Sequence, residues 1–132
     1  AIGSPGGWPI APVAKVGADA LPYPAGIADL EALVGKPFDA AGFARVPQYL
    51  YMGDADANDS LDFEDGWGRP MSAEVDRLFG DTPVARWKQS EALYALAGAN
   101  ARFELVPGIG HDRKALQERS TAFFRQVLAT PD

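Results

Sequence analysis

Acidic side chains and the only histidine of the chain stand in two loops, each of which follows a β-rich run. The first loop, residues 53–60, reads Gly-Asp-Ala-Asp-Ala-Asn-Asp-Ser and carries Asp56 among three carboxylates. The second loop, residues 107–111, reads Pro-Gly-Ile-Gly-His and ends on His111. A carboxylate that accepts a hydrogen bond from one imidazole nitrogen fixes the tautomer of the ring, so that the other nitrogen can take a proton from a hydroxyl. The two residues are therefore a candidate acid and base for nucleophilic catalysis.

Short runs bounded by chain-breaking residues must position these two loops. Residues 48–52 lie between Pro47 and Gly53, and residues 102–106 alternate in polarity, so both runs are predicted strands. Strands separated by helices indicate an α/β fold with a parallel sheet, and ligands bind at the carboxyl ends of such strands. We expect about three mostly parallel strands with flanking helices: strands at 1–3, 48–52 and 102–106, and helices at 27–34, 72–79, 83–97 and 112–129, with a further turn at 39–45.

Local signals predict how these elements begin and pack. Residues 1–26 are rich in Gly and Pro and are predicted to form a loop after the short first strand. Ser72 is the expected N-cap of one helix, and Thr82 followed by Pro83 is the expected start of the next. The 48–52 strand is expected to be buried on both faces, which suggests an incomplete sheet. The predicted apolar stripe of the last helix consists of Leu116, Phe123, Phe124, Val127 and Leu128.

Composition excludes several classes of function. The net charge of −6 argues against a nucleic-acid partner and against an anionic membrane surface. The absence of cysteine excludes disulfides, a thiolate zinc site and a cysteine nucleophile. No apolar run approaches the roughly 20 residues of a membrane span, and no signal peptide is visible. Because the first residue is Ala1 and not Met, we expect that something precedes it.

The order and spacing of the two loops resemble those of the α/β-hydrolase superfamily. In that fold the catalytic triad runs Ser, then Asp or Glu, then His along the chain. Gly53-Asp54-Ala55-Asp56 matches the Gly-x-x-Asp spacing that commonly carries the acid. Gly108-Ile109-Gly110-His111 matches the small turn that carries the histidine, and a helix follows it. The opening Ala1-Ile2-Gly3-Ser4-Pro5-Gly6-Gly7-Trp8-Pro9 resembles the strand after the nucleophile helix and its exit loop, so that the resemblance covers nearly the whole chain.

The nucleophile of that family has no counterpart in this chain. None of the five serines stands in Gly-x-Ser-x-Gly. Ser4 has the wrong spacing, and Pro5 after it has no N–H to donate to an oxyanion. The resemblance thus implies that residues 1–132 are one partial domain, the C-terminal portion of a serine hydrolase of the esterase type. The serine and oxyanion hole would lie in an N-terminal half upstream of Ala1, and the fragment alone would be inactive.

The resemblance also implies further site residues. Asp56 and His111 would be catalytic, with Asp59 as the main rival acid and Asp54 as a weaker one. Trp8 and Trp67 lie in predicted loops at the same end of the sheet and could line a pocket for an ester or acyl substrate. Residues 57–98 are a candidate cap over the site. No cofactor or metal is implied.

A calcium loop is the main alternative. Asp54, Asp56 and Asn58 occupy the first, third and fifth positions of such a loop, and Ser60, Asp62 and Asp65 occupy the seventh, ninth and twelfth. Asp59 stands where that loop requires Gly, and Asp65 is shorter than the usual Glu. In this alternative the chain is a calcium-stabilised binding module and His111 is structural.

A self-contained flavodoxin-like binding domain without a triad is a third possibility. Such a domain needs more strands than the sequence predicts, so the small number of strands disfavours it.

Overall fold

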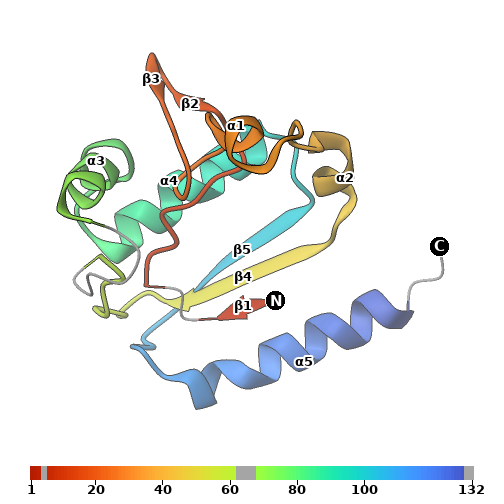
Figure 1. Cartoon of the computed structure of the whole chain (residues 1–132). Coiled ribbons are helices and arrows are strands. Elements are labelled where there is room, and N and C mark those ends of the chain that lie inside the picture. The colour runs from red at the N-terminus through yellow and green to blue at the C-terminus, as the bar shows by residue number, and fades with distance from the viewer. Residues whose placement is uncertain (4–5, 62–67, 130–132) are drawn as a thin grey trace.

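A three-stranded parallel sheet forms the centre of the molecule (Figure 1). The computed structural model describes residues 1–3, 6–61 and 68–129. The sheet order is β1 (Ile2–Gly3), β4 (Gln48–Gly53) and β5 (Ala101–Val106), with β4 in the middle. Both neighbours of β4 run parallel to it, so the predicted α/β class with a parallel sheet is confirmed.

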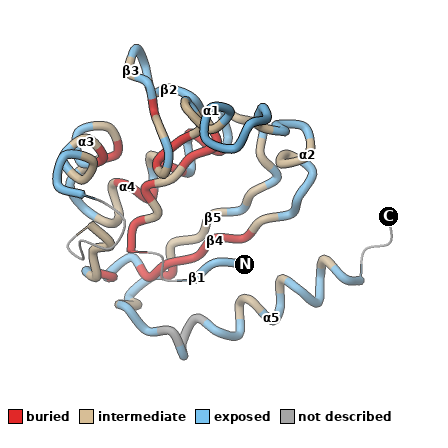
Figure 2. Tube along the Cα trace, in the orientation of Figure 1, coloured by how far each residue is buried: buried red, intermediate tan, exposed pale blue. Residues whose placement is uncertain are grey.

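Two helices cover opposite faces of β4 (Figure 1). Leu50 and Met52 pack against Trp87 of α4 (Pro83–Leu96) on one face. Tyr49 and Tyr51 face the other way, toward Phe123 of α5 (Arg113–Ala129). This alternation follows from the two-residue period of a strand. The tube in Figure 2 shows the buried stretch along β4, and the prediction that this strand is buried on both faces is confirmed.

The segment between β4 and β5 holds α3 (Arg69–Phe79) and α4. Thr82 caps α4, because its Oγ1 accepts a hydrogen bond from the Ala85 amide at 3.2 Å, and Pro83 opens the helix as predicted. Within the 57–98 candidate cap, α4 is a crossover helix that packs on the sheet, and its Trp87 meets the Phe103 ring edge-on at 5.0 Å.

The predicted start of α3 at Ser72 is wrong. The helix begins at Arg69 with Gly68 as its N-cap residue, and the Gly68 carbonyl accepts from the amide of Ser72 at 3.1 Å. Pro70 explains the difference, since its fixed φ and missing N–H suit the first helical turn. Ser72 therefore lies inside the helix and does not cap it.

The stretch predicted as a loop over residues 1–26 contains a small antiparallel hairpin. It pairs β2 (Lys15–Val16) with β3 (Asp19–Ala20) around Gly17, whose φ is 58°. Strands of two residues are too short to show a period in the sequence, which is why the hairpin was not predicted. Two short helices follow, α1 (Leu30–Val34) and α2 (Ala40–Arg45), close to the predicted helix and turn.

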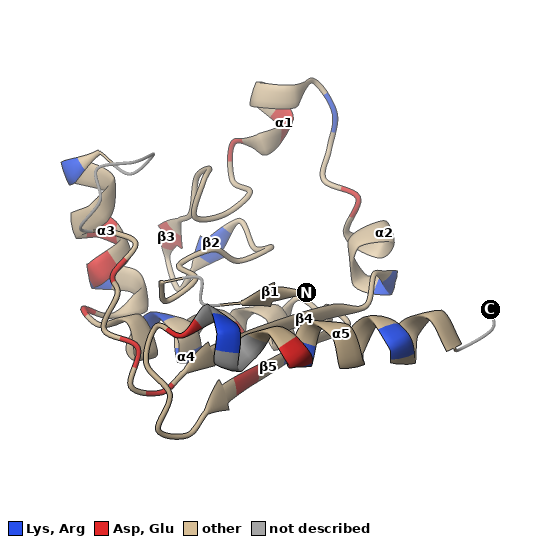
Figure 3. Ribbon diagram, turned by 90° about the horizontal axis from the view of Figure 1, so that it is seen from below, with Lys and Arg blue, Asp and Glu red and all other residues tan. Residues whose placement is uncertain are grey.

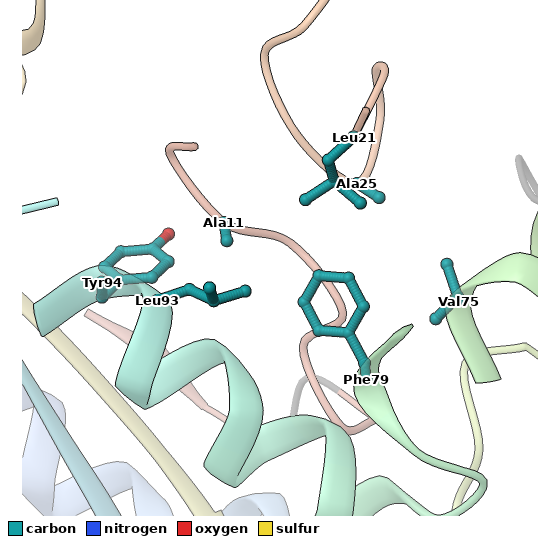
Figure 4. Packing of buried hydrophobic residues seen from close by; sticks show 7 residues of the cluster. All are labelled: Ala11, Leu21, Ala25, Val75, Phe79, Leu93 and Tyr94. Carbon is teal, nitrogen blue, oxygen red and sulfur yellow. The ribbon is translucent and has the colours of Figure 1, made fainter. Parts of the chain in front are cut away.

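A second core lies between the N-terminal segment and the two crossover helices (Figure 4). It explains why a stretch with little regular structure is nevertheless packed: Ala11, Leu21 and Ala25 are almost fully buried. Its members are Ala11, Leu21 and Ala25 from the N-terminal segment, Val75 and Phe79 from α3, and Leu93 and Tyr94 from α4.

The apolar stripe predicted for the last helix is buried only in part. Phe123 packs on Tyr49 at a ring distance of 5.5 Å, but Phe124 is 49% exposed and Leu128 is 85% exposed. The side chain of Leu116 lies outside the described residues. The narrow sheet accounts for the exposure, because β1 adds only two residues beside β4 and little surface remains for the end of α5.

Basic and acidic residues of the described chain are interspersed. In Figure 3 the basic positions are scattered among acidic ones over the helices, consistent with the net charge of −6. Among the residues described, none of the helices combines the length and the apolar character needed to cross a bilayer.

A polar cluster attaches α5 to the sheet. Glu104 of β5 accepts hydrogen bonds from the Tyr49 hydroxyl at 2.7 Å and from Arg119 Nε of α5 at 3.1 Å. The Tyr49 hydrogen bond, together with the nearby guanidinium groups of Arg119 and Arg102, holds the pKa of Glu104 below its usual value of 4.5. Burial, and then the neighbouring carboxylate, raises the pKa of Tyr49 to about 12.

Glu104→Gln should reduce the loss of stability that acid causes. A carboxyl whose pKa is lower in the folded state contributes stability above its ordinary pKa, and that contribution is lost as the pH falls through the folded value. From about pH 5 to about pH 3, the free energy of unfolding measured with urea should therefore fall more steeply for the wild type than for the variant. Glu118→Gln, at an exposed position of the same α5, is the matched control and should keep the wild-type slope. Equal slopes for all three proteins would contradict the assignment.

Candidate active site

The loops that follow β4 and β5 leave the sheet side by side. The two strands pair in register from Gln48 beside Ala101 to Gly53 beside Val106, so both end at the same edge. Backbone hydrogen bonds continue beyond the strands, from the Asp54 amide to the Val106 carbonyl at 3.1 Å and from the Ala55 amide to the Ile109 carbonyl at 3.0 Å. The pairing of the strands thus extends into the two loops that carry the candidate catalytic groups.

Gly53 allows the histidine loop to cross the end of β4. A Cβ atom on Gly53 would lie 1.9 Å from the carbonyl oxygen of Ile109 and 2.8 Å from that of Gly110. Both obstacles are backbone atoms, which cannot turn aside as a flexible side chain can. Gly53, which the sequence presents as a strand breaker, is therefore also the residue that lets the loop before His111 approach the acidic loop.

The structure brings Asp56 and His111 together as predicted. His111 Nδ1 lies 3.1 Å from Asp56 Oδ2, and the side chain of Asp56 is completely buried. The second oxygen, Oδ1, accepts a hydrogen bond from the Asn58 amide at 2.9 Å. With both oxygens engaged, the carboxylate is held in one orientation toward the ring.

The second ring nitrogen of His111 is not engaged by the residues that the structure describes. The His111 side chain is 47% exposed, and Nε2 has no hydrogen-bond partner among the described residues. An ionised carboxylate can only accept hydrogen bonds, so the neutral ring carries its proton on Nδ1. Nε2 is then left with a lone pair that no described group occupies, as a general base needs.

The rival carboxylates of the acidic loop point elsewhere. Asp54 Oδ1 accepts from the Gly108 amide at 2.7 Å and so ties the acidic loop to the histidine loop. Asp59 accepts from its own loop, at the Leu61 amide, and pairs with the buried guanidinium of Arg86. Of the three candidate acids, Asp56 is the one that contacts His111.

The same divergence bears on the calcium alternative. The carboxylates of Asp54, Asp56 and Asp59 are directed at three different partners and do not converge on one point. Asp62 and Asp65, the ninth and twelfth positions of that loop, lie outside the described residues. Within the part of the chain that is described, no group of three or more acidic or histidine side chains is arranged to hold a metal ion.

The two tryptophans predicted to line a substrate pocket have different outcomes. Trp67 lies outside the described residues, as does Ser4. The Trp8 indole packs against the cores around α4, and its Nε1 donates to the Tyr94 hydroxyl at 3.3 Å. Its backbone is left-handed, with a φ of 47°, and its carbonyl accepts from the Ser90 hydroxyl. A role for Trp8 in a pocket stays a prediction.

Two buried polar residues of α4, Arg86 and Ser90, were missed by the sequence interpretation, and Ser60, considered there as a calcium-loop position, has another role. Arg86 and Ser90 are both fully buried, and they occupy the same helical stripe as Trp87, Leu93 and Tyr94. Polar residues three to four positions apart on an apolar stripe were the signal that could have found them. Ser60 donates from Oγ to the Gly6 carbonyl at 2.8 Å and joins the acidic loop to the loop after β1.

No protein-family model, no curated protein sequence and no solved structure matches this chain. The geometry at the end of the sheet is therefore the basis on which a function is inferred.

Gly53→Ala should separate the histidine loop from the acidic loop. The added methyl group meets a backbone carbonyl, so the free energy of unfolding should fall by about 3 kcal/mol, and the Asp56–His111 contact should be lost. Because the chain has one histidine, ¹⁵N NMR of the imidazole reports the contact directly: its neutral form should lose the preference for a proton on Nδ1.

Gly110→Ala is the matched control for this change. A Cβ atom on Gly110 has its nearest neighbour, the Ala55 carbonyl oxygen, at an ordinary 3.7 Å. The control should change stability by about 1 kcal/mol or less and keep the wild-type imidazole signals. If Gly53→Ala also kept those signals, the close crossing of the two loops would be refuted.

Proposed function

We propose that this chain supplies the acid and the general base of a Ser-His-Asp triad in a serine hydrolase of the α/β-hydrolase type. The proposed substrates are esters or related acyl compounds. One observation carries the proposal: the buried Asp56 carboxylate contacts His111 Nδ1 at the carboxyl ends of two adjacent parallel strands, while Nε2 of the half-exposed imidazole has no hydrogen-bond partner among the described residues.

The arrangement along the chain supports this function. The acid follows the middle strand β4, the histidine follows its parallel neighbour β5, and the helix α5 comes next. Acid before histidine is the order that α/β-hydrolases use, with the serine preceding both. In open parallel sheets the carboxyl edge, where these two loops end, is also where ligands bind.

The chemistry assigns one role to each residue. His111 Nε2 takes the proton from a serine hydroxyl as the serine oxygen attacks the ester carbonyl, and Asp56 stabilises the imidazolium that forms. The imidazolium then gives this proton to the departing alkoxide, which leaves an acyl-serine and an alcohol. Water repeats the two proton transfers, releasing the acid and restoring the serine.

The proposed nucleophile lies outside residues 1–132. Of the four described serines, Ser60, Ser90 and Ser120 are engaged with Gly6, Trp8 and Tyr51. The fourth, Ser72, lies within the helix α3 and not at a strand-to-helix turn. Ser4 precedes a proline, which has no N–H for an oxyanion hole. We therefore propose that the serine and the oxyanion hole come from chain that precedes this segment in the complete protein.

His111→Gln, introduced into the complete protein, should abolish ester hydrolysis. Loss of the base should lower kcat for p-nitrophenyl butyrate by about 10³-fold or more, and Asp56→Asn should lower it by about 10³- to 10⁴-fold with little change in KM. Asp81→Asn, at an exposed position before α4, is the matched control and should keep full turnover. Unchanged hydrolysis in the His111 variant would overturn the proposed function.

The isolated 132-residue chain should show no hydrolysis of the same ester above the rate in buffer. It should also remain unlabelled by a fluorophosphonate probe, which reacts with activated serines. The complete protein, labelled in parallel, is the positive control. Labelling of the isolated chain that Ser4→Ala removes would place the nucleophile within this segment and refute the assignment of the serine to preceding chain.

A further inference from the structure

Arg86 is a buried cation behind the acidic loop. Its side chain is 1% exposed and lies in the first turn of α4. The guanidinium pairs with Asp59 through Nη2, and Nη1 donates to Asp76 Oδ1 at 2.7 Å and to the Gly80 carbonyl at 3.1 Å. Arg86 thus links the loop after β4 to the end of α3.

This position is unfavourable for an arginine in three respects. A buried guanidinium loses its hydration, and a positive charge in the first turn opposes the dipole of α4. In addition, Nε is buried without a hydrogen-bond partner among the described residues. An apolar side chain on this buried stripe would avoid all three costs. Features that conflict with the local pattern are expected where function requires them.

Arg86 also lies close to the loop after β1 at the carboxyl edge. Gly7 lies in the loop after β1. A Cβ atom added to it would be only 3.3 Å from Arg86 Nε. That loop is joined to the acidic loop by the two hydrogen bonds from Ser60 to the Gly6 carbonyl. The guanidinium therefore lies where the loops after β1 and β4 meet.

Asp59 connects Arg86 to the loop segment that carries Asp56. The two carboxylates are three residues apart, and each closes a local turn, Asp56 with the Asn58 amide and Asp59 with the Leu61 amide. The two turns are consecutive in one short loop, so a restraint on Asp59 also limits the conformations open to the turn that presents Asp56. Within the described part of the chain, Arg86 is the helical residue to which Asp59 is anchored.

We propose that Arg86 is a positioning residue for the Asp56–His111 pair: through Asp59 it holds the loop after β4 in the conformation that turns Asp56 toward the imidazole. The effect on the contact follows from the structure alone, whereas the effect on turnover rests on the proposed function.

Paired Asp→Asn variants at the two carboxylate partners of Arg86 test this role. Asp59→Asn should weaken the restraint, so that the neutral His111 ring in the 132-residue chain loses part of its preference for a proton on Nδ1, as seen by ¹⁵N NMR. Asp76→Asn, which removes the other carboxylate partner of the same guanidinium, should leave the imidazole signals unchanged. Arg86→Met should give a larger change than Asp59→Asn, and Arg86→Lys should recover part of it.

The activity of the complete protein supplies the second measurement. Arg86→Met should lower kcat by about 10²-fold with KM changed little, since a small displacement of a catalytic group has an effect of this size. Arg77→Met, which removes an exposed arginine paired with Asp19 and Glu74, is the control and should keep kcat.

The outcomes separate the two proposals. Imidazole signals that stay wild-type in Asp59→Asn, or that move equally in Asp59→Asn and Asp76→Asn, overturn the positioning role. If Arg86→Met does not fold, this pair of Asn variants still decides. If His111→Gln retains turnover, the hydrolase proposal fails while the NMR comparison remains decisive for Arg86. If His111→Gln is inactive and Arg86→Met keeps its kcat, the positioning role alone fails.

Discussion

The in-register parallel pairing of β4 with β5 is the constraint on which the rest of the site depends. It ends two strands at one edge, and the backbone hydrogen bonds of the loops extend the pairing beyond Gly53 and Val106. Only glycine at position 53 lets the loop before His111 cross there, since the carbonyl of Ile109 occupies the space of a Cβ atom. Because a strand directs alternate side chains to opposite faces, the same pairing distributes the β4 side chains between α4 and α5. The sheet therefore fixes both the core and the meeting point of the acid and the histidine.

The acidic loop keeps its three carboxylates apart by giving each a different partner. Three carboxylates within six residues would repel one another if they faced the same point, and each instead has a separate partner: the Gly108 amide, His111 and Arg86. This division leaves Asp56 buried and committed to the imidazole while its neighbours fasten the loop on two sides. The buried ion pair of Arg86 contributes little net stability by itself, since desolvation offsets its attraction. The ion pair instead connects the acidic loop to α4 and, through Asp76, to α3.

The prediction of the site succeeded where the signal was local and regular. Thr82 and Pro83 open α4, the breakers around residues 48–52 and the alternation of residues 102–106 give two of the strands, and Gly53 and Gly108 mark the turns. It failed where a residue's role depends on distant neighbours. Arg86 was not singled out, because its partner Asp59 lies 27 residues away along the chain. Phe124 and Leu128 were predicted to be part of the apolar stripe, but the narrow sheet leaves them exposed.

The sequence by itself determined the α/β class, the order of the elements and the two loops that bear Asp56 and His111, because periodicity and chain breakers act within a few residues. Tertiary structure alone decided which of three carboxylates meets the imidazole, since that choice depends on where the Gly108 amide and the Arg86 guanidinium lie in space. It also decided that Trp8 packs toward Tyr94, 86 residues away, a contact that no local pattern contains.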